Sequence, residues 1–168
     1  MSVTEQCLKD AFSGESQARN RYTFFAEIAE KQGKPRIAAL FRATAQAEEI
    51  HARRLFNQLC KGITLEQCLE EAAAGENYEY TEMYPDFQKK AQGEGRKAEE
   101  VLFSQLGPVE EVHCKNYKSA LEELKKGIDL GETGLKIYLC PICGYIEIGK
   151  EVGACPICKC PPAKFISF

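Results

Sequence analysis

Five of the nine cysteines lie in the C-terminal part of the 168-residue chain, and four of them form two CxxC pairs. The pairs are Cys140–Cys143 and Cys155–Cys158, with eleven residues between them. Two such pairs can place four thiolates tetrahedrally around one metal ion, either zinc or iron. The spacing does not distinguish the two metals, and Cys160 is an alternative to Cys158 as the fourth ligand. Cys158 is the predicted ligand because it repeats the geometry of the first pair.

Both histidines of the chain belong to Glu-x-x-His pairs, Glu48–His51 and Glu110–His113. Positions i and i+3 lie on one helical face, and here that face is otherwise apolar, as it is around Glu15. Burying several carboxylates at such positions is costly unless cations neutralise them. One Glu from each of two helices plus Glu-x-x-His from each of two others is the ligand set of a carboxylate-bridged di-iron site.

The helical part is an internal repeat. A shift of 62 residues places Tyr22 on Tyr84, and it also superimposes the two Glu-x-x-His pairs. Each half has the pattern of a helical hairpin, so the repeat predicts an all-α four-helix bundle. The predicted helices are Thr4–Gln32, Pro35–Leu59, Gly75–Gln92 and Arg96–Lys126, with a connector at Lys61–Ala74 that has room for a short helix.

The third helix offers three carboxylates, Glu76, Glu79 and Glu82. The strict repeat partner of Glu15 is Asn77, so the repeat does not choose among them. Glu79 shares a helical face with each of the other two, and the choice stays open at this point.

Composition divides the chain into three parts. Residues 1–126 have a helical composition, residues 127–136 are a Gly-rich linker, and residues 137–168 hold the cysteine pairs among short β-type runs. A segment as small as the last one buries too little apolar surface to fold alone, so a metal is expected to hold it together. The fold class is therefore a helical bundle followed by a small, mostly β and loop metal domain.

Net charge and hydropathy exclude several functions. The chain carries a net charge of −3 and a pI near 5.6, which argues against binding to nucleic acid. No apolar run is long enough to span a membrane, and the polar N-terminus does not resemble a signal peptide. A reducing, cytoplasmic setting is expected, where clustered cysteines bind metal more often than they form disulfides.

Several segments resemble the rubrerythrin family over nearly the full length of the chain. GESQARNRY (14–22), AEEIHARRLF (47–56), GENYEYTEMYPDF (75–87) and VEEVH (109–113) are similar to its ferritin-like di-iron domain. CPICGY (140–145) and CPICKCPPAKF (155–165) are similar to its rubredoxin-like domain. The resemblance implies iron rather than zinc in the tail, although either site can also take zinc. It further implies the di-iron ligands Glu15, Glu48, His51, Glu79, Glu82, Glu110 and His113, with Glu82 and His51 exchanging on reduction.

The same resemblance implies an enzyme that protects against oxidative stress. Such a peroxidase reduces hydrogen peroxide to two waters with two electrons and two protons. The four-cysteine iron would relay the electrons, one at a time, from a rubredoxin or an NAD(P)H-dependent reductase. Tyr22 would donate a hydrogen bond near the di-iron site. The family also implies a head-to-tail homodimer that brings the tail iron of one chain beside the di-iron site of the other.

Two other functions fit parts of the pattern. A ferroxidase or iron-storage protein would share the bundle, and a non-enzymatic redox module would carry a zinc ribbon as its tail. Gly107-Pro108 departs from the family, because proline is expected to kink or restart the fourth helix. Cys160 also departs, at a position where the family commonly has glycine. The remaining cysteines, Cys7, Cys60, Cys68 and Cys114, are expected to be reduced packing or surface residues.

Overall fold

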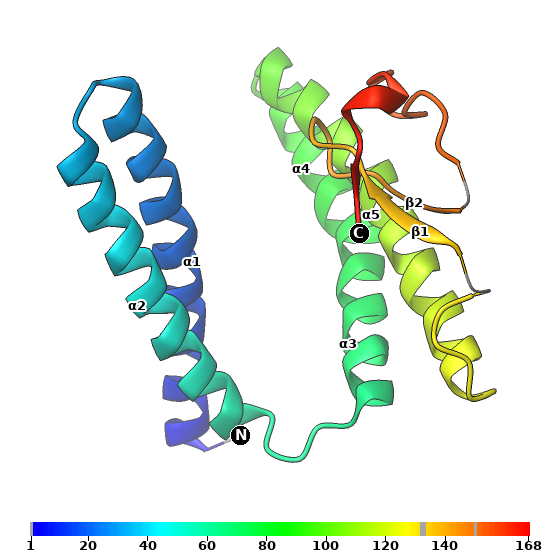
Figure 1. The fold of residues 1–168 in the computed structure, drawn as a ribbon, viewed down its shortest axis with the longest axis horizontal. Helices are drawn as coiled ribbons and strands as arrows, with labels where there is room; N and C mark the ends of the chain where they lie inside the picture. The colour runs from blue at the N-terminus through cyan, green and yellow to red at the C-terminus, as the bar shows by residue number, and fades with distance from the viewer. Residues whose placement is uncertain (1, 132–133, 150) are drawn as a thin grey trace. The chain divides into compact units, whose positions relative to one another are not determined.

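The computed structural model describes residues 2–131, 134–149 and 151–168 of the chain (Figure 1). Residue contacts divide it into two compact units, Met1–Ile63 and Thr64–Phe168. The first unit is a helical hairpin, and the second contains further helices and the cysteine domain. Within the described ranges, no helix is long and apolar enough to cross a membrane.

The first unit consists of α1 (Val3–Lys31) and α2 (Pro35–Leu59). Ser2 caps α1 by accepting a hydrogen bond from the Glu5 amide, and Pro35 starts α2, as predicted. The turn between the helices needs Gly33, whose φ is +68°. Alanines are buried where the two helices approach each other, so the hairpin core is narrow.

The second unit starts with one long helical stretch made of α3 (Leu65–Tyr78), the π-helix η1 (Glu79–Met83) and α4 (Tyr84–Gly93). The prediction began this helix at Gly75 and treated residues 61–74 as a connector, which is wrong. Thr64 and Gln67 form a capping box that starts the helix ten residues earlier than Gly75. The T-x-x-Q pattern that marks such a box is visible in the sequence.

The fourth predicted helix is α5 (Lys97–Leu124), which is helical throughout despite Pro108. The helix therefore does not restart at Gly107-Pro108. Pro108 and Ser104 are both exposed. The Ser104 carbonyl would accept the helical hydrogen bond that Pro108, lacking an N–H, cannot donate. Because water can hydrate this carbonyl, the lost hydrogen bond is tolerated without ending the helix.

The internal repeat is reproduced in detail by the aromatic side chains. The rings of Tyr22, Phe25 and Phe41 lie 5.5–6.2 Å apart, centre to centre. Their partners in the second half, Tyr84, Phe87 and Phe103, lie 5.6–6.5 Å apart. The hairpin turns also match, with Gly33 at φ +68° and Gly95 at φ +70°.

The cysteine domain is a three-stranded antiparallel sheet in the order β2-β1-β3. Its strands are β1 (Lys136–Leu139), β2 (Ile146–Gly149) and β3 (Ile166–Ser167), with a short 3₁₀-helix, η2 (Pro162–Lys164), before β3. The domain belongs to the same compact unit as α3–α5. Residues 132 and 133 of the predicted linker lie outside the described residues.

Candidate metal centres

The two CxxC turns bring Cys140, Cys143, Cys155 and Cys158 together, as predicted. Their Sγ atoms all lie within 4.8 Å of one another. Sγ of Cys140 is 3.5 Å from that of Cys158, and Sγ of Cys143 is 3.5 Å from that of Cys155. Burial opposes ionisation of Cys140, but hydrogen bonds from backbone amides of the same turn outweigh it and lower its pKa to about 6. Four converging thiols, one with a lowered pKa, suit a metal that prefers thiolate ligands.

The two cysteine turns are related by an internal symmetry. In the first knuckle (Cys140–Tyr145) the Cys140 amide donates to the Tyr145 carbonyl, and in the second knuckle (Cys155–Cys160) the Cys155 amide donates to the Cys160 carbonyl. Cys160 is therefore the counterpart of Tyr145 and lies outside the four-thiol cluster, although it is buried beside it. The residues with positive φ are Gly144 and Lys159, so the position in the second knuckle that favours glycine is Lys159 rather than Cys160.

The first carboxylate–histidine cluster joins α1 to α2. Nδ1 of His51 lies 2.9 Å from Glu48 and 3.7 Å from Glu15. A hydrogen bond between the carboxyls raises the pKa of Glu15 and lowers that of Glu48. The two carboxyls are therefore coupled by this hydrogen bond when no cation is present.

The second cluster repeats this geometry with α3 and α5. Nδ1 of His113 lies 2.8 Å from Glu110 and 3.9 Å from Glu76. Burial, followed by the charge of Glu110, raises the pKa of Glu76. Each cluster thus offers two carboxylates and one imidazole nitrogen, which are donors suited to iron.

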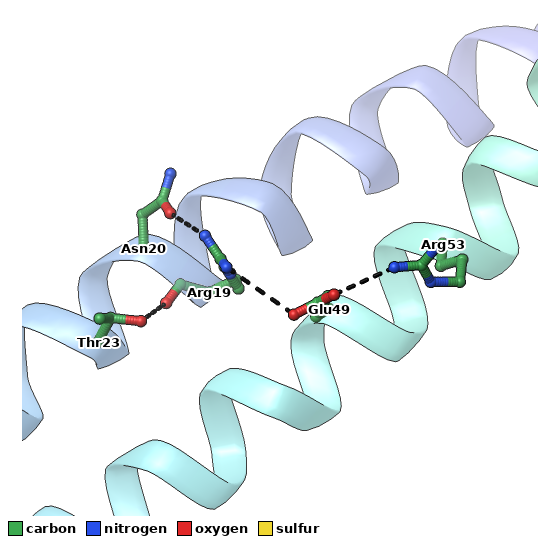
Figure 2. A network of polar contacts seen from close by, with 5 residues as sticks. All are labelled: Arg19, Asn20, Thr23, Glu49 and Arg53. Atoms are coloured by element: carbon green, nitrogen blue, oxygen red, sulfur yellow. Dashed lines mark hydrogen bonds and ion pairs between the residues drawn. The ribbon is translucent and has the colours of Figure 1, made fainter. Parts of the chain in front are cut away.

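The glutamate that directly follows Glu48 or Glu110 in the sequence lies outside the clusters, and only the structure shows this. Figure 2 shows Glu49, next to Glu48, between two arginines: it is 3.1 Å from Arg53 and 3.8 Å from Arg19. Glu111, next to Glu110, pairs with Lys115 at 2.6 Å. Exposed ion pairs of this kind contribute little to stability. The second Glu of each EE dipeptide thus meets a basic side chain, whereas the first faces its histidine.

Among the carboxylates of the third helix, Glu76 is the one that joins the cluster. Glu79 is half-buried, and burial followed by the charge of Glu76 raises its pKa. Glu82 is exposed near the end of η1 and does not belong to the cluster among the described residues. The wider turn of a π-helix prevents residues three apart from sharing a face as they do in an α-helix. The predicted role of Glu79 and Glu82 as ligands therefore stays a prediction.

The π-helix also explains why the repeat did not identify Glu76. Glu76 precedes Tyr84 by eight residues, whereas Glu15 precedes Tyr22 by seven. A π-helical bulge absorbs one extra residue. Before η1 the repeat therefore runs with a shift of 61, which places Glu15 on Glu76. The same shift places Leu8 on Leu69 and Gly14 on Gly75, so the signal was present in the sequence as a one-residue insertion.

The predicted contact of Tyr22 with the site is not seen in the described residues, where its recorded contacts are the rings of Phe25 and Phe41. Its repeat partner Tyr84 interacts electrostatically with the carboxylates of the second cluster. Burial, followed by the charges of Glu79, Glu110 and Glu76, raises the pKa of Tyr84. The phenol therefore stays protonated beside the second cluster.

The cysteine domain meets the second cluster directly. Nε2 of His113 is 2.9 Å from the carbonyl oxygen of Gly144, which follows the ligand Cys143. The Asn116 amide donates to the Ile146 carbonyl at 3.4 Å, and Val109 of α5 is buried among the cysteines. No sequence signal points to these contacts, because they join residues about 30 positions apart with no shared motif.

The other four cysteines have no place in these clusters. Cys114 is buried, and its thiol donates to the Ala73 carbonyl at 3.3 Å, so it packs α5 against α3. Cys7 is exposed, and Cys60 and Cys68 are half-buried. All nine cysteines, each within the described ranges, are free of disulfides.

Comparison with known proteins supports the same assignment. A family model for rubrerythrin matches residues 6–121. Rubrerythrins of Porphyromonas gingivalis and Nitratidesulfovibrio vulgaris are each 39% identical over 98% of this chain, which covers 89% and 93% of those proteins. A mixed-valence structure of nigerythrin has a TM-score of 0.59 at 35% identity, over all of this chain and 88% of that one.

These likenesses confirm the predicted fold class, a ferritin-like helical part followed by a rubredoxin-like domain. They also fit the predicted cofactors. The carboxylate–histidine clusters have the donors of a carboxylate-bridged di-iron site, and the four cysteines have those of a single-iron site. The chain belongs to the rubrerythrin family of di-iron oxidoreductases.

Proposed function

We propose that the protein is a non-haem peroxidase that reduces hydrogen peroxide to water, with electrons supplied through the four-cysteine iron. The observation that carries the proposal is the hydrogen bond between His113 and Gly144. It joins a candidate di-iron ligand to the residue next to a tail ligand. A ferroxidase would not need this connection, and a structural zinc ribbon could not use it for electrons.

The hydrogen bond determines the tautomer of His113. The Gly144 carbonyl can only accept, so Nε2 of His113 must carry the hydrogen. When a cation is bound beside Glu110 and Glu76, Nδ1 can then direct its lone pair to that cation. Histidine ligands are commonly held in this way by their second nitrogen. The same contact gives electrons a short route from Cys143 through Gly144 to His113.

We propose that both clusters supply iron ligands. These are Glu15, Glu48 and His51 in the first half and Glu76, Glu110 and His113 in the second. The predicted ligands Glu79 and Glu82 stay part of the proposal. When bound, the two irons supply two electrons and open coordination positions for peroxide. Tyr84 supplies a neutral O–H beside the carboxylates, and Tyr22 is proposed for the same task in the first half. The exchange of Glu82 with His51 on reduction stays a proposal carried over from the family.

The partners in this function follow the family expectation. We propose a rubredoxin or an NAD(P)H-dependent reductase as the source of electrons and a cytoplasmic setting for the reaction. The head-to-tail homodimer also remains a prediction. It is carried over from the resemblance to the family. Light scattering tests the dimer, and a fully active monomer would contradict it.

The function is tested by stopped-flow reoxidation of the iron-loaded, fully reduced protein. Hydrogen peroxide is expected to reoxidise the helical site much faster than O₂, and the tail iron should then follow. Faster reoxidation by O₂ than by peroxide would support a ferroxidase instead. Metal analysis with a visible spectrum is the control for the tail, because a four-cysteine iron is red when oxidised and zinc is colourless.

A further inference from the structure

The two knuckles of the cysteine domain face different surroundings. The first knuckle packs against α5, where the Gly144 carbonyl meets His113 and a Cβ on Gly144 would lie 3.8 Å from Val109. In the second knuckle, Pro156 and Lys159 are exposed and Cys158 is half-buried. Pro141 and Ile142 of the first knuckle are exposed as well, so the difference between the knuckles lies at one equivalent position. Gly144 contacts α5, whereas its counterpart Lys159 is exposed.

Lys159 has an unusual backbone conformation for a lysine. Its φ is +63°, and the equivalent residue of the first knuckle is Gly144, with φ +84°. Glycine holds such a turn without steric cost, so a lysine there suggests a use for the side chain. Its ammonium donates to the Pro156 carbonyl at 3.0 Å, which keeps the positive charge over the second knuckle.

The segment around Lys159 carries only positive charges, although the chain as a whole carries −3. Residues 156–165 contain two lysines and no acidic residue. Lys164 in η2 interacts electrostatically with Cys160, so both lysines lie near the metal ligands. Neither forms an ion pair with an Asp or Glu in the part of the chain that the structure describes. Exposed prolines lie between them in the sequence.

We infer that this surface docks an electron-donor protein with an acidic face. The donor surface, as we call it, consists of the exposed residues Pro156, Lys159, Pro161, Pro162 and Lys164. The inference rests on the proposed function and names the partner class for its electron entry. The donor is oxidised by one electron and the tail site is reduced by one. Electrons enter through the second knuckle and leave through the first, towards His113.

Charge complementarity is the reason for choosing a protein donor. Transient redox complexes bury little surface, and opposite charges speed their encounter. A small apolar area with cations at its edge fits such a complex. A donor with carboxylates around its own metal site would approach Lys159 and Lys164 while its apolar centre meets the prolines.

The test uses the iron-loaded full chain and measures the rate of tail-iron reduction by stopped flow. The protein donor is a reduced rubredoxin of net negative charge, and the small donor is the methyl viologen radical cation. The variant is Lys159→Glu with Lys164→Glu. The matched control, Lys118→Glu with Lys126→Glu, makes the same charge change on exposed lysines at other places.

At low salt, the double reversal on the donor surface should slow reduction by rubredoxin at least about tenfold, whereas the control should keep the wild-type rate. High salt should bring the two rates together. Reduction by methyl viologen should not slow. An equal loss in the control, or a matching loss with methyl viologen, would overturn the inference.

Peroxide turnover driven by methyl viologen separates this inference from the function. If the donor surface is wrong but the function is right, wild type and the double variant both reduce peroxide with this small donor, and rubredoxin reduces both tails equally. If the wild type does not turn over peroxide with methyl viologen, the proposed function itself fails.

Discussion

The two halves of the helical repeat carry the same metal-binding geometry but hold it differently. The distance from histidine Nδ1 to the nearer carboxylate is 2.9 Å in the first half and 2.8 Å in the second. The side chain of His51 is 50% exposed, whereas that of His113 is 17% exposed. The second half is more enclosed because the cysteine domain packs on α5.

The two histidines therefore differ in how many of their ring nitrogens have a partner. Both nitrogens of His113 are engaged, Nδ1 with carboxylates and Nε2 with the Gly144 carbonyl. The recorded contacts of His51, among the described residues, all involve Nδ1. A histidine held at both nitrogens suits a fixed electron route, and one held at a single nitrogen suits a ligand that is exchanged. The repeat therefore gives both halves the same residue types, and the contact with the cysteine domain gives His113 a hydrogen bond that His51 lacks among the described residues.

The largest expected effect tests the similarity of the halves. Glu48→Ala and Glu110→Ala should each lower peroxide turnover and the iron content of the helical part by more than about tenfold, since even groups that only support metal ligands cost that much. The matched controls are Glu49→Ala and Glu111→Ala, which remove only surface ion pairs. Iron analysis and steady-state turnover measure both. Unequal losses for the two ligands would show that one half dominates metal binding.

A second prediction concerns the third helix, where the halves differ by the π-helical residue. Glu76→Gln should lower the iron content of the helical part about as much as Glu15→Gln, because the two positions are equivalent in the clusters. Glu82→Gln should retain iron and only slow turnover, with an unchanged tail spectrum. If Glu82→Gln loses as much iron as Glu76→Gln, Glu82 is also an iron ligand, and the iron-loaded protein places the carboxylates of the third helix differently from this structure.

A third prediction concerns Pro108, which occupies the place of Gln46 in the first half. Pro108→Gln restores an amide that can donate to the Ser104 carbonyl. We expect the free energy of unfolding to rise by about 1 to 3 kcal/mol, measured by urea denaturation. Iron content should not change, because Pro108 is exposed and lies outside both clusters. A loss of stability would mean that the proline is needed for the shape of α5.

The smallest effect is spectroscopic. Nitrogen NMR of the metal-free protein should show a hydrogen on Nε2 of His113 that exchanges slowly. His51, whose Nε2 has no recorded partner in the described residues, should show a faster exchange. Equal exchange at both histidines would remove the distinction between a held and a freer ligand.

Most residues of the clusters were predictable because the regular geometry of a helix places residues of a given spacing on one face. Glu48–His51 and Glu110–His113 are three residues apart on α-helices, so each pair must share a face. The CxxC pairs behave in the same way in their turns. Glu76 was missed because η1 adds one residue to the helix, and a repeat compared at a single shift cannot accommodate that insertion.

The sequence by itself determined the helical repeat, the two Glu-x-x-His pairs, the four-cysteine site and the family. These depend on contacts between residues close in the chain, where spacing is sufficient. Only the tertiary structure decided that Glu76 rather than Glu82 joins the cluster, that Tyr84 lies beside it, and that His113 bonds to Gly144. These depend on how a π-helix turns and on how a separate small domain packs against α5. Such packing arises from shape and burial spread over many residues, and no local pattern in the sequence records it.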